Sequence, residues 1–155
     1  MRKQGGFSLI ELLIVVAIIL IIAAIALPNL LRSRVAAQEA AAANHLKTIN
    51  TAETNYTTTY PGCGFVQMPA LGGNGSGPSA SGIIDNVFPD RQGYHFTINL
   101  SGPSGTCGVT SGTSYSIQAD PTTGIPYQRH FFSDATGVIR YNSSGPASVT
   151  DPIIQ

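Results

Sequence analysis

Residues 7–27 read FSLIELLIVVAIILIIAAIAL, and Glu11 is the one charged residue among them. A helix of this length reaches roughly 31 Å, which matches a bilayer core of about 30 Å. Arg2 and Lys3 precede the segment. Because basic flanks stay on the cytoplasmic side, the sequence predicts a single membrane span with the N-terminus inside and the remainder of the chain exported.

Three interpretations compete for this segment. A secretory signal peptide has the same basic start and apolar stretch, and residues 24–26, AIA, resemble its cleavage site, which would release a protein beginning at Leu27. A simple membrane anchor needs the apolar stretch alone. Neither explains Glu11, because a carboxylate in a membrane helix costs about 2.5–3.5 kcal/mol and is by default functional.

The residues around Glu11 favour the third interpretation. Residues 5–12, GGFSLIEL, resemble the signature of the type IV pilin-like superfamily: a short basic leader ending in Gly, then Phe, then Glu four residues further on. Pro28 stands where many type IV pilins carry a helix-interrupting proline. The resemblance covers residues 1 to about 35. It implies a structural subunit of a type IV pilus-like filament, with a pseudopilin of a type II secretion system as the alternative.

The resemblance also implies how the chain is processed. A membrane prepilin peptidase would cut between Gly6 and Phe7 and methylate the new α-amino group of Phe7. The expected parts are a leader at residues 1–6, a transmembrane and later filament-core helix at 7–28, and a periplasmic or extracellular head at 29–155. The implied partners are further copies of the chain in a helical filament, the peptidase and methyltransferase, the inner-membrane assembly machinery and the membrane itself. The chain is expected in the inner membrane before assembly and in a periplasmic or cell-surface filament afterwards.

Glu11 has a physical role in this interpretation. Its carboxylate is expected to pair with the Phe7 amine of a neighbouring subunit, because each charge is expensive when left unpaired in an apolar setting. Two alternatives remain open for the carboxylate. It neutralises the amine of its own chain, or it reaches the lipid headgroups near the end of the helix.

The helix is expected to continue beyond the membrane, from Phe7 to about Asn55. Residues 29–60 contain neither Gly nor Pro and are rich in Ala, a strong helix former. Proline removes a backbone donor and clashes with the preceding turn, so a kink is predicted at Pro28. An apolar stripe at helical spacing is predicted to face the head, although Glu39 and Glu53 interrupt it: Leu31, Val35, Ala42, Leu46, Ile49 and Tyr56.

Residues 61–155 have a different composition, with most of the 17 glycines and 10 prolines of the chain. A long loop is expected over residues 62–82. Alternating patterns predict strands at 94–100, 115–119, 127–132 and 138–141, with a tight hairpin at 133–137. The predicted fold class is therefore α+β, a long N-terminal helix packed on a three- or four-stranded antiparallel sheet.

Cys63 and Cys107 are the two cysteines of the chain. Because the region after residue 28 is expected in an oxidising compartment, the two are predicted to form a disulfide, with two free buried thiols as the alternative.

Composition and motifs argue against other functions. The formal net charge is zero and 10% of residues are charged, whereas nucleic-acid binders carry clustered basic residues. No phosphate-binding loop or nucleophile-elbow motif occurs, so no enzyme activity is predicted. His45, His95 and His130 share no metal-ligand spacing, and no metal site or cofactor is predicted. Calcium at Asp134 and Asp151 is kept as a minor alternative without a recognised loop spacing.

Overall fold

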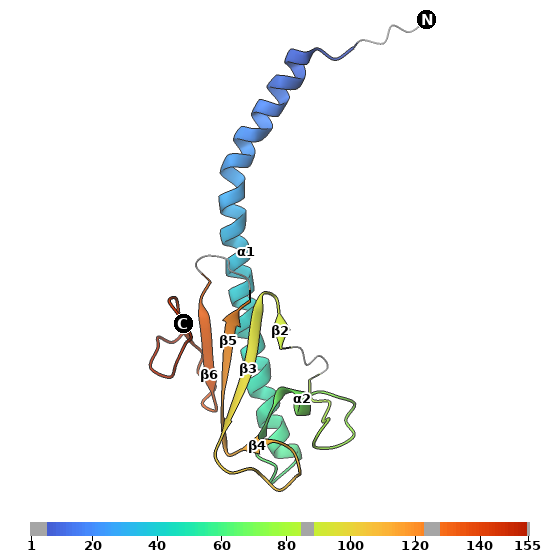
Figure 1. Ribbon diagram of the computed structural model, residues 1–155, viewed down its shortest axis with the longest axis vertical. Helices are drawn as coiled ribbons and strands as arrows, with labels where there is room; N and C mark the ends of the chain where they lie inside the picture. Colours follow the sequence, from blue (N-terminus) through green and yellow to red (C-terminus); the bar gives the residue numbers. More distant parts are fainter. Residues whose placement is uncertain (1–5, 85–88, 123–127, 155) are drawn as a thin grey trace, which may run out of the picture. The chain divides into compact units, whose positions relative to one another are not determined.

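The computed structural model describes residues 6–84, 89–122 and 128–154, and its architecture is α+β (Figure 1). The helices are α1 (Leu9–Thr59) and the short α2 (Met68–Leu71). The strands are β1 (Phe65–Val66), β2 (Asp90–Arg91), β3 (Tyr94–Ser101), β4 (Ser111–Gly112), β5 (Ser114–Pro121), β6 (His130–Asp134) and β7 (Arg140–Asn142). The chain divides into two compact units, residues 1–36 and 37–155, and α1 runs from the first into the second.

The long helix predicted from the sequence is confirmed, and it continues for one turn past Asn55. Six threonines between residues 48 and 59 bond their hydroxyls to backbone carbonyls three or four residues earlier, which satisfies these polar side chains within the helix. Past Thr59 the chain turns through Pro61 and Gly62, and the latter has a φ of 88° that favours glycine. Pro28 lies inside α1, which is helical on both sides of it, and the kink stays a prediction.

The main sheet is antiparallel and has five strands, in the order β2-β3-β5-β6-β7. The prediction of three or four strands was therefore too low, because the two-residue β2 is too short to show an alternating pattern. The strand predicted at 127–132 lies at His130–Asp134, and Tyr127 falls outside the described residues. The hairpin predicted at 133–137 is confirmed, with the Gly137 N–H donating to the Asp134 carbonyl at 2.9 Å.

A second, two-stranded sheet pairs β1 with β4 and was not predicted. Its first strand lies inside the region where the sequence suggests a loop. Each strand is two residues long, so neither shows a hydrophobic period.

The core of the 37–155 unit lies between the second half of α1 and the main sheet (Figure 1). Of the predicted stripe, the last four residues are buried, whereas Leu31 is 58% exposed and Val35 is half-buried. The most deeply buried large side chains of α1 and the sheet are Leu46, Ile49, Tyr56, Tyr94, Ile117 and Phe131. Burying each such side chain contributes about 1.5–3 kcal/mol to folding.

The predicted disulfide between Cys63 and Cys107 is confirmed. It joins the segment that follows α1 to the connection between β3 and β4. Gly105 lies in the same connection, and a Cβ there would overlap the backbone carbonyl of Cys63. The two backbones can approach this closely because residue 105 has no side chain.

We expect the Cys63→Ser/Cys107→Ser variant to be less stable than the wild type by about 3–4 kcal/mol, because the disulfide constrains a long loop in the unfolded chain. The measurement is denaturant unfolding of the detergent-solubilised full chain. Alkylation with and without reductant, read by intact mass, provides the control that the wild type starts oxidised. An unchanged unfolding midpoint would contradict the expectation.

Candidate functional site

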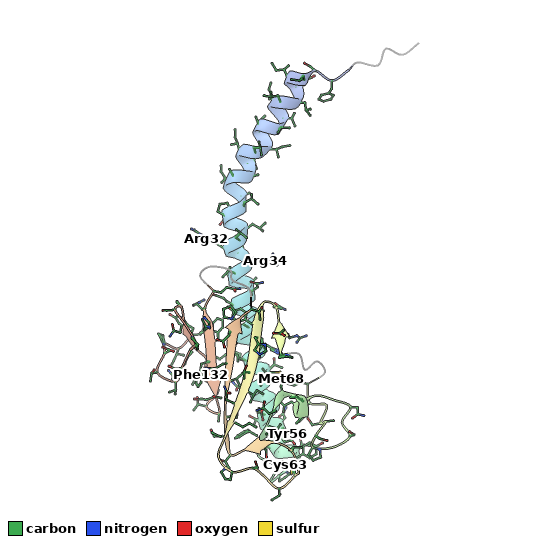
Figure 2. All side chains as sticks on the ribbon, viewed as in Figure 1. Arg32, Arg34, Tyr56, Cys63, Met68 and Phe132 are labelled. Carbon is green, nitrogen blue, oxygen red and sulfur yellow. A yellow bond between two sulfur atoms is a disulfide. The ribbon has the colours of Figure 1, made fainter. Side chains whose placement is uncertain are left out.

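The first half of α1 exposes an unusually large apolar surface. Every large aliphatic side chain from Leu9 to Leu31 is 46% exposed or more, although soluble monomers rarely expose extended apolar patches. Figure 2 shows these side chains standing out from α1, followed by Arg32 and Arg34. Within the described residues, α1 is the one helix long and apolar enough to cross a membrane. This surface needs a partner that is not water.

The predicted cleavage residues lie just before this helix. Gly6 and Phe7 precede α1 and are exposed, and nothing lies within 4 Å of a Cβ built on Gly6. The chain's own packing therefore does not require glycine at position 6. If glycine is required at position 6, the requirement comes from another protein that binds this segment.

Glu11 lies in the first turn of α1 and makes a contact there that was not predicted from the sequence. The Ser8 carbonyl accepts the first helical hydrogen bond, from the Leu12 N–H, which makes Ser8 the N-cap residue. The Ser8 N–H donates to Oε2 of Glu11 at 3.2 Å. This is half of a capping box, and the Ser-x-x-Glu spacing was a readable signal for it. The other carboxylate oxygen of Glu11 has no hydrogen-bond partner within the described residues.

In the head, two further acidic residues of α1 lie at the helix–sheet interface. Glu39 is buried and accepts from the backbone N–H of Arg129 at 3.0 Å and from its guanidinium at 3.0 and 2.6 Å. The guanidinium also stacks on Tyr141, 4.8 Å from the ring centroid. The hydrogen bond to Glu39 raises the pKa of Arg129, and the contacts between the two residues attach the start of β6 to α1.

Glu53 is fully buried and has no cationic partner within the described residues. Its Oε2 accepts from the Val66 N–H at 3.1 Å, which attaches β1 to α1, whereas Oε1 lacks a hydrogen-bond partner in the same part of the chain. Burial raises the pKa of Glu53 to about 7, against the opposing effect of the Val66 hydrogen bond.

A small buried polar network lies between these two glutamates. Asn50 donates to Ser133 Oγ at 2.7 Å and accepts from the Tyr115 hydroxyl at 2.9 Å, while the Ser133 hydroxyl donates to the Val138 carbonyl at 3.2 Å. The network joins α1 to both β5 and β6. Each polar group is satisfied, as a buried network requires.

The three histidines lie on different elements. His45 packs edge-on against Phe96 with ring centroids 4.6 Å apart, and burial together with the charge of Arg91 lowers its pKa. Each of the other two bonds to a carboxylate through Nδ1: His95 to Asp90 at 2.7 Å and His130 to Asp120 at 2.6 Å. No group of three or more potential metal ligands is found in residues 6–84, 89–122 and 128–154.

The two aspartates considered for calcium are each used within their own loops. Asp134 accepts from the N–H and hydroxyl of Thr136, and Asp151 accepts from the N–H and hydroxyl of Ser148. The Ser148 N–H holds the pKa of Asp151 below its ordinary value. These contacts give both carboxylates a structural role in the turns that contain them.

Comparison with known proteins identifies the N-terminal segment. Residues 1–27 match the family model described as the prokaryotic N-terminal methylation motif. The chain therefore carries at its N-terminus a segment similar to the methylation motif of prepilins, as the sequence predicted.

Two curated relatives carry the likeness further. The chain is 47% identical, over 125 residues or 80% of its length, to the type IV major pilin protein PilA of Myxococcus xanthus. Over 34 residues, 22% of the chain, it is 65% identical to the type IV wide pilus major component PilA4 of Thermus thermophilus. These alignments cover 48% and 26% of the two relatives, so the chain spans about half of the first and a quarter of the second. No solved structure matches the chain.

The buried state of Glu53 predicts a pH-dependent stability. The pKa of Glu53 in the folded protein, about 7, lies above the ordinary value of 4.5. The contribution of protonated Glu53 to the free energy of unfolding is therefore fully present below pH 4.5 and is lost as the pH rises to about 7. The loss is about 3 kcal/mol. We therefore expect Glu53→Gln to match the wild type near pH 4 and to be more stable by up to this amount at pH 8.

The measurement is denaturant unfolding of both proteins at the two pH values. The difference between variant and wild type isolates Glu53, because every other titrating group is common to both. A constant difference across the pH range would show that folding leaves the pKa of Glu53 unchanged, and would contradict the expectation.

Proposed function

We propose that the chain is a non-enzymatic structural subunit of a type IV pilus-like filament, assembled through its N-terminal helix. The observation that carries this proposal is the exposed apolar surface of α1, with Glu11 as the one charge between Phe7 and Leu31. A membrane and a bundle of identical helices are the two environments that cover such a surface. Moving from lipid to the filament core exchanges one apolar environment for another, so it requires little net free energy.

Processing of the leader precedes assembly in this proposal. Prepilin peptidase cuts between Gly6 and Phe7, where the chain is exposed and outside the helix, and the Phe7 amine is methylated. Residues 1–6 leave, residues 7–28 form the membrane and filament-core segment, and residues 29–155 form the exported head. Cutting removes Arg2 and Lys3, the charges that hold the N-terminus in the cytoplasm.

Glu11 then acts between subunits. One oxygen of its carboxylate accepts from its own Ser8 N–H, and the second is available to a cation. The Phe7 amine of a neighbouring subunit supplies that cation and sets the axial register, since an offset leaves two charges unpaired in an apolar core. The inner-membrane assembly machinery supplies the mechanical work.

A pilus is favoured over the pseudopilin alternative by the relatives, both of which are named as major components of type IV pili. The surface location follows from the same proposal: a single-pass inner-membrane precursor and a filament outside. Gold-labelled antibody against the head tests it directly. Labelled surface fibres support the pilus, and periplasmic label alone supports the pseudopilin.

The mature protein is expected to begin at N-methylated Phe7. Intact mass and N-terminal fragmentation of the purified filament protein measure this. A chain beginning at Leu27 would instead identify a signal peptide and contradict the filament proposal.

Two substitutions separate the roles of Glu11. Glu11→Ala removes both the charge and the cap, whereas Glu11→Gln keeps an oxygen for the Ser8 N–H and removes the charge alone. If the ion pair between subunits drives assembly, we expect both variants to insert into the membrane normally. The amount of filament is expected to fall at least tenfold in each. Membrane fractionation and quantitation of sheared filaments provide the two readouts.

The contrasting result is equally specific. Normal filaments from Glu11→Gln with loss from Glu11→Ala would assign Glu11 to helix capping and contradict the ion pair.

A further inference from the structure

Most charged side chains of the described head have a partner within the head. Glu39 pairs with Arg129, Asp90 and Asp120 bond to histidines, and Glu53 is buried. Arg140 donates to the Asp151 carbonyl at 2.9 Å. Lys47 of α1, Arg91 of β2 and Asp134 of β6 are among the charged side chains that have no ion pair within the described residues.

Lys47 and Arg91 line the same groove, which runs along α1 beside β2. It has a volume of about 550 Å³ and is lined by Lys47, Thr48, Thr51, Ala52, Asn55, Ile83, Ile84 and Arg91. A second hollow of about 290 Å³ lies beside it and shares Thr48 and Arg91 with it. Neither is lined by a carboxylate of the described residues. We call this feature the α1–β2 groove.

Asp134 lies in an exposed turn on the opposite side of the sheet. β2 is one edge strand, whereas Asp134 ends β6 and begins the turn to the other edge strand, β7 (Figure 1). Residues 135–137 of this turn are exposed, and Gly137 has a φ of 74° that the turn requires. Oδ1 of Asp134 is held by Thr136, which fixes the carboxylate and leaves Oδ2 free to bond elsewhere.

We propose that the α1–β2 groove binds the Asp134 turn of a second copy of this chain, with Lys47 and Arg91 contacting the Asp134 carboxylate. The groove and the turn are different surfaces on opposite edges of one sheet, so a copy that offers its turn keeps its own groove open. Such a heterologous contact repeats without closing and builds a polymer. The inference rests on the proposed filament function and adds the head surfaces that pair within it.

The charges determine both the strength and the selectivity of this contact. An exposed ion pair contributes modestly, so removing it is expected to lower the ratio of filament to unassembled subunit by about two- to fivefold. A groove with two cations rejects a turn that carries a basic residue, because like charges in contact repel. Salt in the medium weakens the contact, because it screens exposed charges.

The experiment is a double-mutant cycle in cells that assemble the full chain. The variants are Lys47→Gln/Arg91→Gln, Asp134→Asn and their combination. Asparagine at 134 keeps the oxygen that accepts from Thr136, so the turn is retained while the charge is removed. Asp120→Asn serves as the matched control, because it removes one carboxylate charge whose partner is His130 of the same chain.

The readout is the ratio of sheared filament to cell-associated subunit, with thermal melting of each purified variant to show an intact head. We expect the groove variant and Asp134→Asn each to lower the ratio, the combination to lower it no further, and Asp120→Asn to leave it unchanged. Additive losses, or wild-type ratios in the groove variant or in Asp134→Asn, overturn the contact.

The wild type distinguishes the two proposals. Wild-type filaments together with unaffected variants overturn the contact alone, and the proposed function stands. A wild type that forms no filament overturns the proposed function and the contact with it.

Discussion

One helix, α1, has to satisfy two different environments, and the rest of the structure depends on how it divides between them. Up to Leu31 its large apolar side chains are exposed on every side, which water does not stabilise. From Ala42 onward one face is buried under the sheet and the other is polar. The head therefore completes its own core with half of the helix, and leaves the other half to an external apolar partner.

Polar side chains determine the position of the second half of α1 against the sheet. Glu39, Asn50 and Glu53 are separated by 11 and three residues, spacings that keep them on one face of a helix. Each contacts a different part of the head, at the start of β6, at β5 and β6, and at β1. Apolar packing tolerates small shifts of one element along another. Three directional contacts along one face do not tolerate such shifts, so they fix the rotation of the helix and its axial position against the sheet.

The sequence predicted the features that arise from long, periodic or local patterns. The helix, the two long central strands, the Asp134 hairpin and the disulfide were all confirmed. It could not predict β1, β2 and β4, because strands of two residues have no period and form only where a distant partner is present. Glu39 and Glu53 seemed to interrupt the apolar stripe for a similar reason. Their partners lie 90 and 13 residues away, and no local pattern identifies those partners. The capping contact of Glu11 was not predicted, although it is local and the Ser8–Glu11 spacing indicates it.

The disulfide also determines how the head would carry mechanical load. Tension applied through α1 enters the head at the segment after Thr59 and reaches Cys63 within a few residues. From there the covalent bond passes it directly to Cys107, which lies 44 positions further along the chain, so the segment between the two cysteines carries no force. That segment includes β1, α2, β2 and β3, and it would extend by roughly 150 Å if it unravelled. The bond removes this slack, so the segment between the two cysteines cannot lengthen under load while the disulfide is intact.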